Sequence, residues 1–256
     1  MNRIRHFAPG IVSVVGFFAV WEIYCRMSGI NPLILPPPSQ IGAIFFDVAL
    51  DPRTLRHASI TLTETLAGFG LATVIGMTVG WAVAASPLIE RAVHPFIVAS
   101  QVIPKVALVP LFVVWFGFGM TSKIVVAAVI AFFPVLVNTV LGLRSVQPGH
   151  ADVFHSLKAT LWQRIWLLQI PSALPAILAG MEMAIVLATI GAVVGEFLGG
   201  SSGLGYMAVA TMNAFQTDRL FVIIILLTLI GFVLYAMMAG LKRALVSWSD
   251  NQKPGS

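Results

Sequence analysis

The chain has 256 residues, 58% of them hydrophobic and 10% charged, with a mean hydropathy of +0.95 and a formal net charge of +5. This composition excludes a soluble globular protein and indicates an integral membrane protein. The only cysteine, Cys25, allows no internal disulfide and suggests no cysteine-based metal site. We expect the positive charge to reflect membrane topology and lipid contact, so no nucleic-acid partner is predicted.

Six apolar stretches are long enough to cross a membrane as helices, since hydrocarbon about 30 Å thick requires roughly 20 apolar residues. They cover residues 8–27, 60–85, 93–116, 122–143, 172–198 and 220–241. A membrane β-barrel would show shorter alternating segments, so the predicted fold class is an all-α membrane protein. We expect one domain over residues 1–256, with a short segment near 41–50 after a proline-rich connector.

The distribution of Lys and Arg predicts the orientation of these spans. Six spans place both termini on one side, which receives nine basic residues, Lys253 among them, against five on the other side. Because cytoplasmic loops retain positive charge, we expect cytoplasmic termini and a cytoplasmic loop at 144–171. The basic start of the first span resembles a signal peptide, but no small-residue cleavage site follows, so we expect a retained helix.

Several motifs of nucleotide and metal chemistry are missing from the sequence. There is no GxxxxGK[ST] phosphate loop, no HExxH zinc motif and no GxSxG nucleophile elbow. The stretch Gly203–Ala208 fits GxGxxA, but it follows a membrane helix where a dinucleotide fold needs a buried strand. We expect a flexible external hairpin there, and we predict no catalytic residue, resident metal or cofactor in this chain.

Charged side chains inside apolar spans are the candidate functional groups, because they cost free energy unless they are paired or line an aqueous path. In the fifth span, helical periodicity places Glu182, Thr189 and Glu196 on one face and small residues on the opposite face. The small residues predict close packing against another helix, as does the Gly76 and Gly80 pair of the second span. The candidate substrate-path residues are Glu182, Thr189, Glu64 and Lys105.

Structural roles for these groups are also open. Glu182 could be protonated or paired, with Lys105 as a possible partner, and could merely fix the helix register. Neighbouring threonines could satisfy Glu64 locally. At about 1.5 Å per residue, Glu182 lies at membrane depth whereas Glu196 lies near the external surface, where we expect it to be solvated.

The loop between the fourth and fifth spans has an amphipathic pattern. Apolar residues recur at three- and four-residue steps from Phe154 to Leu168, which predicts a helix with one apolar stripe. Such a helix could lie on lipid headgroups or dock a soluble partner. Periodicity does not separate these two interpretations.

Four stretches together carry a resemblance to a known family. They are LPPPSQI at Leu35–Ile41, PKVALVPLFVVWFGFGMTSK at Pro104–Lys123, the loop Asp152–Ala159 with IPSALPAILAGM at Ile170–Met181, and VVGEFLGGSSGLGY at Val193–Tyr206. In these residues the chain resembles the membrane-spanning permease subunit of binding-protein-dependent ABC importers, a family that includes nitrate, sulfonate, taurine and thiamine-precursor systems.

The resemblance implies a type I ABC importer permease fold. Its cytoplasmic loop would hold a coupling helix seated in a groove of an ATPase subunit. The residues that match the family's docking loop are Asp152, His155, Ser156, Leu157, Lys158 and Ala159. The family's loop usually reads like EAARSLGA, so Lys158 replaces the usual glycine, and a lysine turns less freely than glycine.

The same resemblance implies the partners. Two permease copies would form a homodimer in the bacterial inner membrane. Two ATPase subunits would bind ATP and Mg²⁺, and a periplasmic or lipid-tethered solute-binding protein would deliver the solute. The permease itself would be no enzyme; it would supply a path whose access alternates.

The solute and the driving force are less constrained. The stretch PKVALVPLFVVWFGFG is more similar to thiamine-precursor and riboflavin systems than to nitrate systems, whereas a charged Glu182 favours a neutral or cationic solute. The alternative is a secondary transporter driven by an ion gradient through intramembrane Glu and Lys, although that class usually has more spans or an inverted repeat. A structural membrane protein or an intramembrane enzyme is a further alternative, for which no nucleophile and base pair is found.

Overall fold

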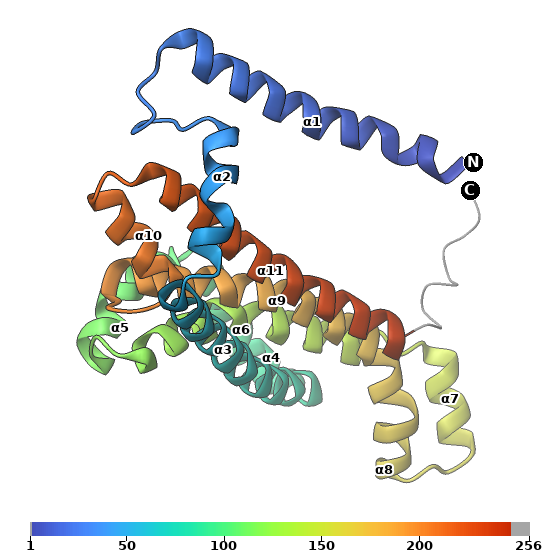
Figure 1. The fold of residues 1–256 in the computed structure, drawn as a ribbon. Helices are drawn as coiled ribbons and strands as arrows, with labels where there is room; N and C mark the ends of the chain where they lie inside the picture. The colour runs from blue at the N-terminus through green and yellow to red at the C-terminus, as the bar shows by residue number, and fades with distance from the viewer. Residues whose placement is uncertain (1, 247–256) are drawn as a thin grey trace.

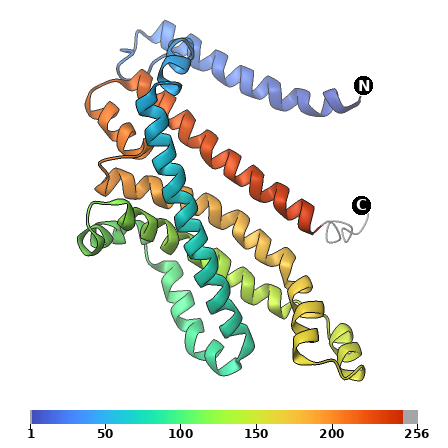
Figure 2. The ribbon, with the colours of Figure 1, turned by 60° about the horizontal axis from the view of Figure 1, so that its bottom comes forward.

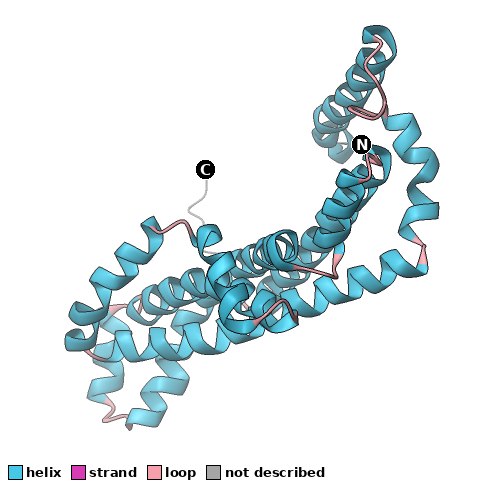
Figure 3. Ribbon diagram, turned by 90° about the vertical axis from the view of Figure 1, so that its left-hand side faces the viewer, coloured by secondary structure: helices cyan, strands magenta, loops and turns pink. Residues whose placement is uncertain are grey.

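The computed structural model describes the backbone of residues 2–246, and the side chains of that range except those of 2–9, 11, 100 and 101. Lys253, which counted toward the predicted orientation, lies outside the described residues. Within them the chain is built from helices and connecting loops, without a strand (Figure 3). The predicted all-α fold is therefore confirmed.

Four helical segments among the described residues are long and apolar enough to cross a membrane, and they contain the second, fourth, fifth and sixth predicted spans. The segment from Leu161 to Gly199 is one of the four and comprises α8, η2 and α9. The elements in chain order are α1 (Asn2–Ser28), α2 (Pro38–Ala49), α3 (Pro52–Ala85), α4 (Pro87–Val102), η1 (Lys105–Leu108), α5 (Val109–Phe116), α6 (Met120–Arg144), α7 (Pro148–Ser156), α8 (Leu161–Arg164), the π-helix η2 (Ile165–Gln169), α9 (Ile170–Gly199), α10 (Leu204–Asn213) and α11 (Thr217–Leu245).

The third predicted span, residues 93–116, is not one helix. α4 ends at Val102, and Pro104 adopts an extended conformation with φ −70° and ψ 92° before η1 begins. Because proline lacks an N–H and the residue before it avoids the α-region, the helix does not continue through this point. Pro110 lies in the first turn of α5, where a missing N–H is tolerated. The prediction of a continuous third span is therefore wrong, whereas α6 continues through Pro134.

Small residues let α3 and α9 approach α6 closely from two sides. A Cβ atom on Gly76 would lie 2.9 Å from the Cβ of Val135, and one on Gly191 would lie 2.8 Å from the Cα of Ala127. Buried alanines of α6 and α9 complete this apolar core. The small-residue faces predicted for the second and fifth spans are confirmed, and they fix the three helices in one tightly packed unit.

Replacing Gly68 with leucine should test this close approach. A Cβ at Gly68 would lie 2.5 Å from the Cβ of Ala127 and 3.0 Å from the backbone oxygen of Ile124, so overpacking should destabilise the permease by about 1–3 kcal/mol. Gly70→Leu is the matched control, because nothing lies within 4 Å of a Cβ at Gly70. Thermal unfolding of both purified variants in detergent should show a lower Tm for Gly68→Leu alone; equal Tm values would contradict the packing.

Two parts of the chain stand out from the bundle of long helices: the α7–α8 segment and α1 (Figures 1 and 2). α7 and α8 extend beyond the end where α6 finishes and α9 starts, whereas α10 covers the opposite end. α1 stands apart from the other long helices and packs mainly on α2, with Trp21 reaching Phe221 of α11. Below, the two ends are called the α7–α8 end and the α10 end.

Candidate functional site

The protruding α7–α8 segment is shaped by specific caps. α7 ends in a Schellman arrangement, in which the Ala159 N–H donates to the Phe154 oxygen and the Lys158 N–H donates to the His155 oxygen, each at 3.0 Å. Lys158 takes the left-handed position with φ +51°. This is the conformation that glycine adopts without strain, so Lys158 makes the turn that a glycine would make.

The next helix starts immediately after this turn. Thr160 and Gln163 form a capping box at the beginning of α8. The single amphipathic helix predicted from Phe154 to Leu168 is therefore wrong, because the Schellman turn and the capping box divide it into two helices. The apolar periodicity persisted across the turn and concealed it.

The tip of this segment, where α7 ends and α8 begins, presents apolar side chains to its surroundings. Leu157 is 73% exposed, and Leu161 and Trp162 are each 70% exposed. α7 has no buried residue and no extensive packing against another helix in the described part of the chain. The residues predicted to dock an ATPase lie together here: Asp152, His155, Ser156, Leu157 and Lys158 are exposed and Ala159 is half-buried. A short helix that buries nothing within its own chain is typical of a surface that packs on a partner.

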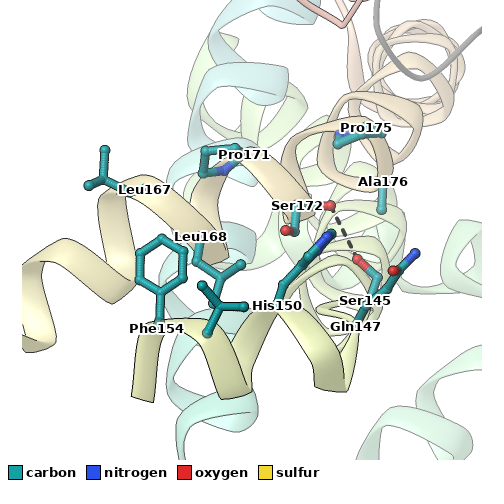
Figure 4. A pocket seen from close by; sticks show the side chains of 11 residues that line it. Ser145, Gln147, His150, Phe154, Leu167, Leu168, Pro171, Ser172, Pro175 and Ala176 are labelled. Carbon is teal, nitrogen blue, oxygen red and sulfur yellow. Dashed lines mark hydrogen bonds between the residues drawn. The ribbon is translucent and has the colours of Figure 1, made fainter. Parts of the chain in front are cut away.

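A pocket of roughly 660 Å³ separates α7 from the start of α9 (Figure 4). His150 and Phe154 line it from α7, and Leu168 and Pro171 line it from the other side. The Ser145 hydroxyl donates to the Ser172 oxygen at 3.1 Å and ties the end of α6 to α9. The tip is thus anchored at its base but is not packed against the bundle along its length.

An ion pair also marks this end of the bundle. Arg144, the last residue of α6, donates to the Glu90 carboxylate in the first turn of α4. This hydrogen bond lowers the pKa of Glu90, so the carboxyl is charged at neutral pH. The pair connects α4 to α6 beside the tip.

Glu64, predicted as a substrate-path residue, lies in a buried charge cluster toward the α10 end. Its carboxylate is 3.0 Å from the Lys123 ammonium, and both side chains are at most 2% exposed. Lys123 also donates to the backbone oxygen of Ser202 at 3.0 Å. Lys123 was not predicted as a site residue, because its charge was assigned to an external loop. Its position inside the predicted fourth span, residues 122–143, was the signal that could have identified it.

Glu196 belongs to the same cluster, which corrects two predictions. Its carboxylate accepts hydrogen bonds from the Thr61 hydroxyl and the Gly205 N–H, both at 2.6 Å, and the residue is only 1% exposed. The prediction that Glu196 is solvated is wrong, because the loop of residues 200–203 and the start of α10 fold over it. The expected flexible hairpin is also wrong, since Leu204 starts the helix α10 directly after Gly203, which has φ +101°.

The remaining predicted path residues are separated from this cluster. Glu182 pairs with Lys242 of α11 at 2.9 Å rather than with Lys105, so the suggested Lys105 partner is wrong. Thr189 is 7% exposed and its hydroxyl donates to the Ile185 oxygen of its own helix at 2.9 Å. The Lys105 ammonium instead lies 4.8 Å from the centre of the Phe133 ring. The structure therefore does not join the four predicted residues in one site.

The comparisons with known proteins agree on one family. Residues 72–247 match the model of the binding-protein-dependent transport system inner membrane component. The chain is 38% identical to the formylaminopyrimidine transport permease protein of Halalkalibacterium halodurans, covering 91% of this chain and 92% of that protein. It is 37% identical to the riboflavin transport system permease protein of Chloroflexus aurantiacus, covering 97% and 93%. Further relatives are named as permeases for sulfonates, taurine and nitrate.

The fold has a counterpart among solved structures. An inward-facing structure of the MetNI methionine ABC transporter aligns with a TM-score of 0.66 at 19% identity, over 75% of this chain and 95% of that chain. The relatives are named as transport permeases and not as enzymes. With the family model matching more than half of the sequence, the chain belongs to the family of binding-protein-dependent inner-membrane transport components and is an ABC importer permease subunit.

Proposed function

We propose that this permease works in an ATP-driven importer in which the α7–α8 tip docks on an ABC ATPase subunit. This proposal rests on the exposed apolar surface of the tip: Leu157, Leu161 and Trp162 are exposed, and α7 buries no residue. A groove on a soluble partner would remove this apolar surface from water. Two ATPase copies would bind ATP and Mg²⁺, and the permease would do no covalent chemistry.

The surroundings of the tip support a mechanical role. The π-helix at Ile165–Gln169 lies between the tip and α9, and such wide turns often mark functional points in helices. α9 in turn is packed tightly on α6 through small residues. Movement of the tip on ATPase closure would pass along α9 and shift the bundle between outward-facing and inward-facing states.

The assembly that we propose has two permease copies and an external delivery protein. α1 exposes apolar side chains such as Val12 and Phe17 and packs mainly on α2, so a second copy offers a packing surface in the membrane. If the tip faces the cytoplasm, both termini are cytoplasmic. The α10 end then faces outward and receives solute from a periplasmic or lipid-tethered solute-binding protein.

The solute is proposed to lie in the range of the relatives, from thiamine precursors to sulfonates, taurine and nitrate. The relatives with 38% and 37% identity are named for formylaminopyrimidine and riboflavin. Both agree with the similarity of PKVALVPLFVVWFGFG to thiamine-precursor and riboflavin systems. Family membership also favours ATP over an ion gradient as the driving force.

Uptake by the purified complex tests this function. The permease would be purified from its native membranes with its ATPase, identified by mass spectrometry, and placed in liposomes with its solute-binding protein. We expect uptake of the solute carried by that protein to require internal ATP and to persist when ionophores dissipate ion gradients. Uptake without ATP that ionophores abolish would support the secondary-transporter alternative.

A further inference from the structure

Lys105 occupies an unusual position for a charged residue. It is the first residue of η1, at the break that divides the third predicted span into α4 and α5. Its ammonium lies over Phe133, which is near the middle of α6, about 20 Å from one end and about 17 Å from the other at 1.5 Å per residue. A hydrocarbon layer about 30 Å thick therefore places this charge close to the centre of the membrane.

The other charged residues of the described chain that lie inside the predicted spans have charged or polar partners. Glu64 is paired with Lys123, and Glu182 is paired with Lys242. None of the ion pairs among the described residues includes Lys105. The lysine contacts an aromatic face instead, and its side chain is half-buried. Lys105 is thus a positive charge near the membrane centre that no carboxylate of the described residues neutralises.

An aromatic contact does not by itself account for a charge at this depth. A cation over an aromatic ring gains up to about 2 kcal/mol when desolvated. Placing a lysine at the centre of a membrane helix costs about 2.5–3.5 kcal/mol or more. The side chain is also too short to reach either membrane surface from the centre. Because this cost exceeds the gain from the aromatic contact, we expect the Lys105 ammonium also to contact water or an oxygen acceptor inside the bundle.

The surroundings leave space for such an acceptor. Val106 and Ala107, which follow Lys105, are exposed. Phe133 also lines a groove of roughly 420 Å³ between α3 and α6, together with Leu71 and Phe132. This volume lies within the range of small-molecule sites. Lys105 does not line this groove itself and is connected to it through the Phe133 ring. The lysine has three N–H donors to offer an oxygen, while the neighbouring groove would take the apolar body of a solute.

From this arrangement we propose that Lys105 and Phe133 form a mid-membrane contact for the transported solute and that they select solutes bearing an anionic or carbonyl oxygen. The inference rests on the proposed transport function and deepens it. The proposal differs from the neutral or cationic solute that a charged Glu182 favoured, because Glu182 is already paired with Lys242. Cations would be repelled by Lys105, and oxygen-bearing solutes would be held.

A labelling experiment on the full-length chain in its native membrane tests the proposal without knowledge of the solute. With Cys25 replaced by alanine, Val106→Cys provides a single reporter thiol beside Lys105, since the chain has one cysteine and Val106 is 48% exposed. The probes are the anionic sulfonatoethyl and the cationic trimethylammonioethyl methanethiosulfonates. We expect both to react, the anion faster, and we expect Lys105→Gln to lower the anion-to-cation rate ratio on the order of tenfold.

Arg53→Gln is the matched control, because it removes an equal charge from an exposed residue at the start of α3 and should leave the ratio unchanged. The proposal is overturned if neither reagent reaches Val106→Cys, or if Lys105→Gln leaves the ratio unchanged. Because the labelling requires no ATP hydrolysis, its failure is distinct from a failure of ATP-dependent uptake. Lys105→Arg, which keeps the charge, should retain most of the anion preference.

Discussion

Replacing Lys123 with methionine is expected to destabilise the permease by about 3–5 kcal/mol, more than any exposed charge replacement in this chain. Methionine removes the ammonium that lies 3.0 Å from the Glu64 carboxylate, and Glu64 is fully buried. Glu64 must then keep an uncompensated charge in an apolar interior or take up a proton. Lys123 also holds the backbone of Ser202, so the loop of residues 200–203 between α9 and α10 loses an anchor.

Thermal unfolding of the detergent-solubilised variants measures this effect. Adding Glu64→Gln to Lys123→Met should recover part of the lost stability, because the buried carboxylate is then removed as well. Lys242→Met is the control. This variant breaks the ion pair between Lys242, whose side chain is 37% exposed, and Glu182, whose side chain is 16% exposed. Such partly solvated pairs contribute about 0–1 kcal/mol to stability. Equal Tm values for Lys123→Met and the native protein would show that the cluster does not stabilise the fold.

The buried cluster also explains the α10 end of the fold. Glu196 on α9 binds Thr61 of α3 and the first turn of α10, and Lys123 brings α6 to the same place. One set of polar contacts therefore fixes three long helices and the loop that covers them. A buried polar network of this kind specifies an arrangement that apolar packing alone would leave degenerate.

The long helices could be predicted because their signal is local. Length and hydropathy predicted α3, α6, α9 and α11, and the spacing of Gly76 and Gly80 predicted a close-packed face. Pro104 could be recognised as a residue that can kink the third span, but hydropathy continues through it and did not show that the helix ends there. Apolar periodicity did not show the turn after Ser156, which only the family's glycine at the position of Lys158 indicated, although Thr160 and Gln163 stand at capping-box spacing in the sequence.

The charged groups could be found in the sequence but not their partners. Glu64, Glu182 and Lys105 were recognised as costly at membrane depth, yet their contacts come from other helices. Periodicity reports which face of one helix a residue occupies; it carries no information on the helix opposite. Glu196 was placed near the surface by its distance along α9, which could not show that α10 and its preceding loop cover it.

Leu157→Asp is expected to lower ATPase binding and ATP-dependent uptake at least tenfold while leaving the permease folded. Leu157 is 73% exposed at the turn after α7, so its replacement should change the free energy of unfolding by no more than about 0.5 kcal/mol. If the side chain fills an apolar groove of the ATPase, a carboxylate there would be desolvated without a partner. Losses of 2 kcal/mol or more are typical of such central contacts, which corresponds to a factor of about 30 in affinity.

Co-purification of the ATPase with the tagged permease and uptake by the reconstituted complex measure the two effects separately. Leu88→Asp is the matched control, because Leu88 is 78% exposed at the start of α4 and lies off the tip. Lys158→Gly should bind the ATPase at least as well as the native chain, since glycine adopts the φ of +51° without strain. Normal ATPase retention and uptake by Leu157→Asp would place the docking surface elsewhere. The tip would then be an interfacial segment on lipid headgroups, because that is the other environment in which α7 could cover its exposed apolar side chains.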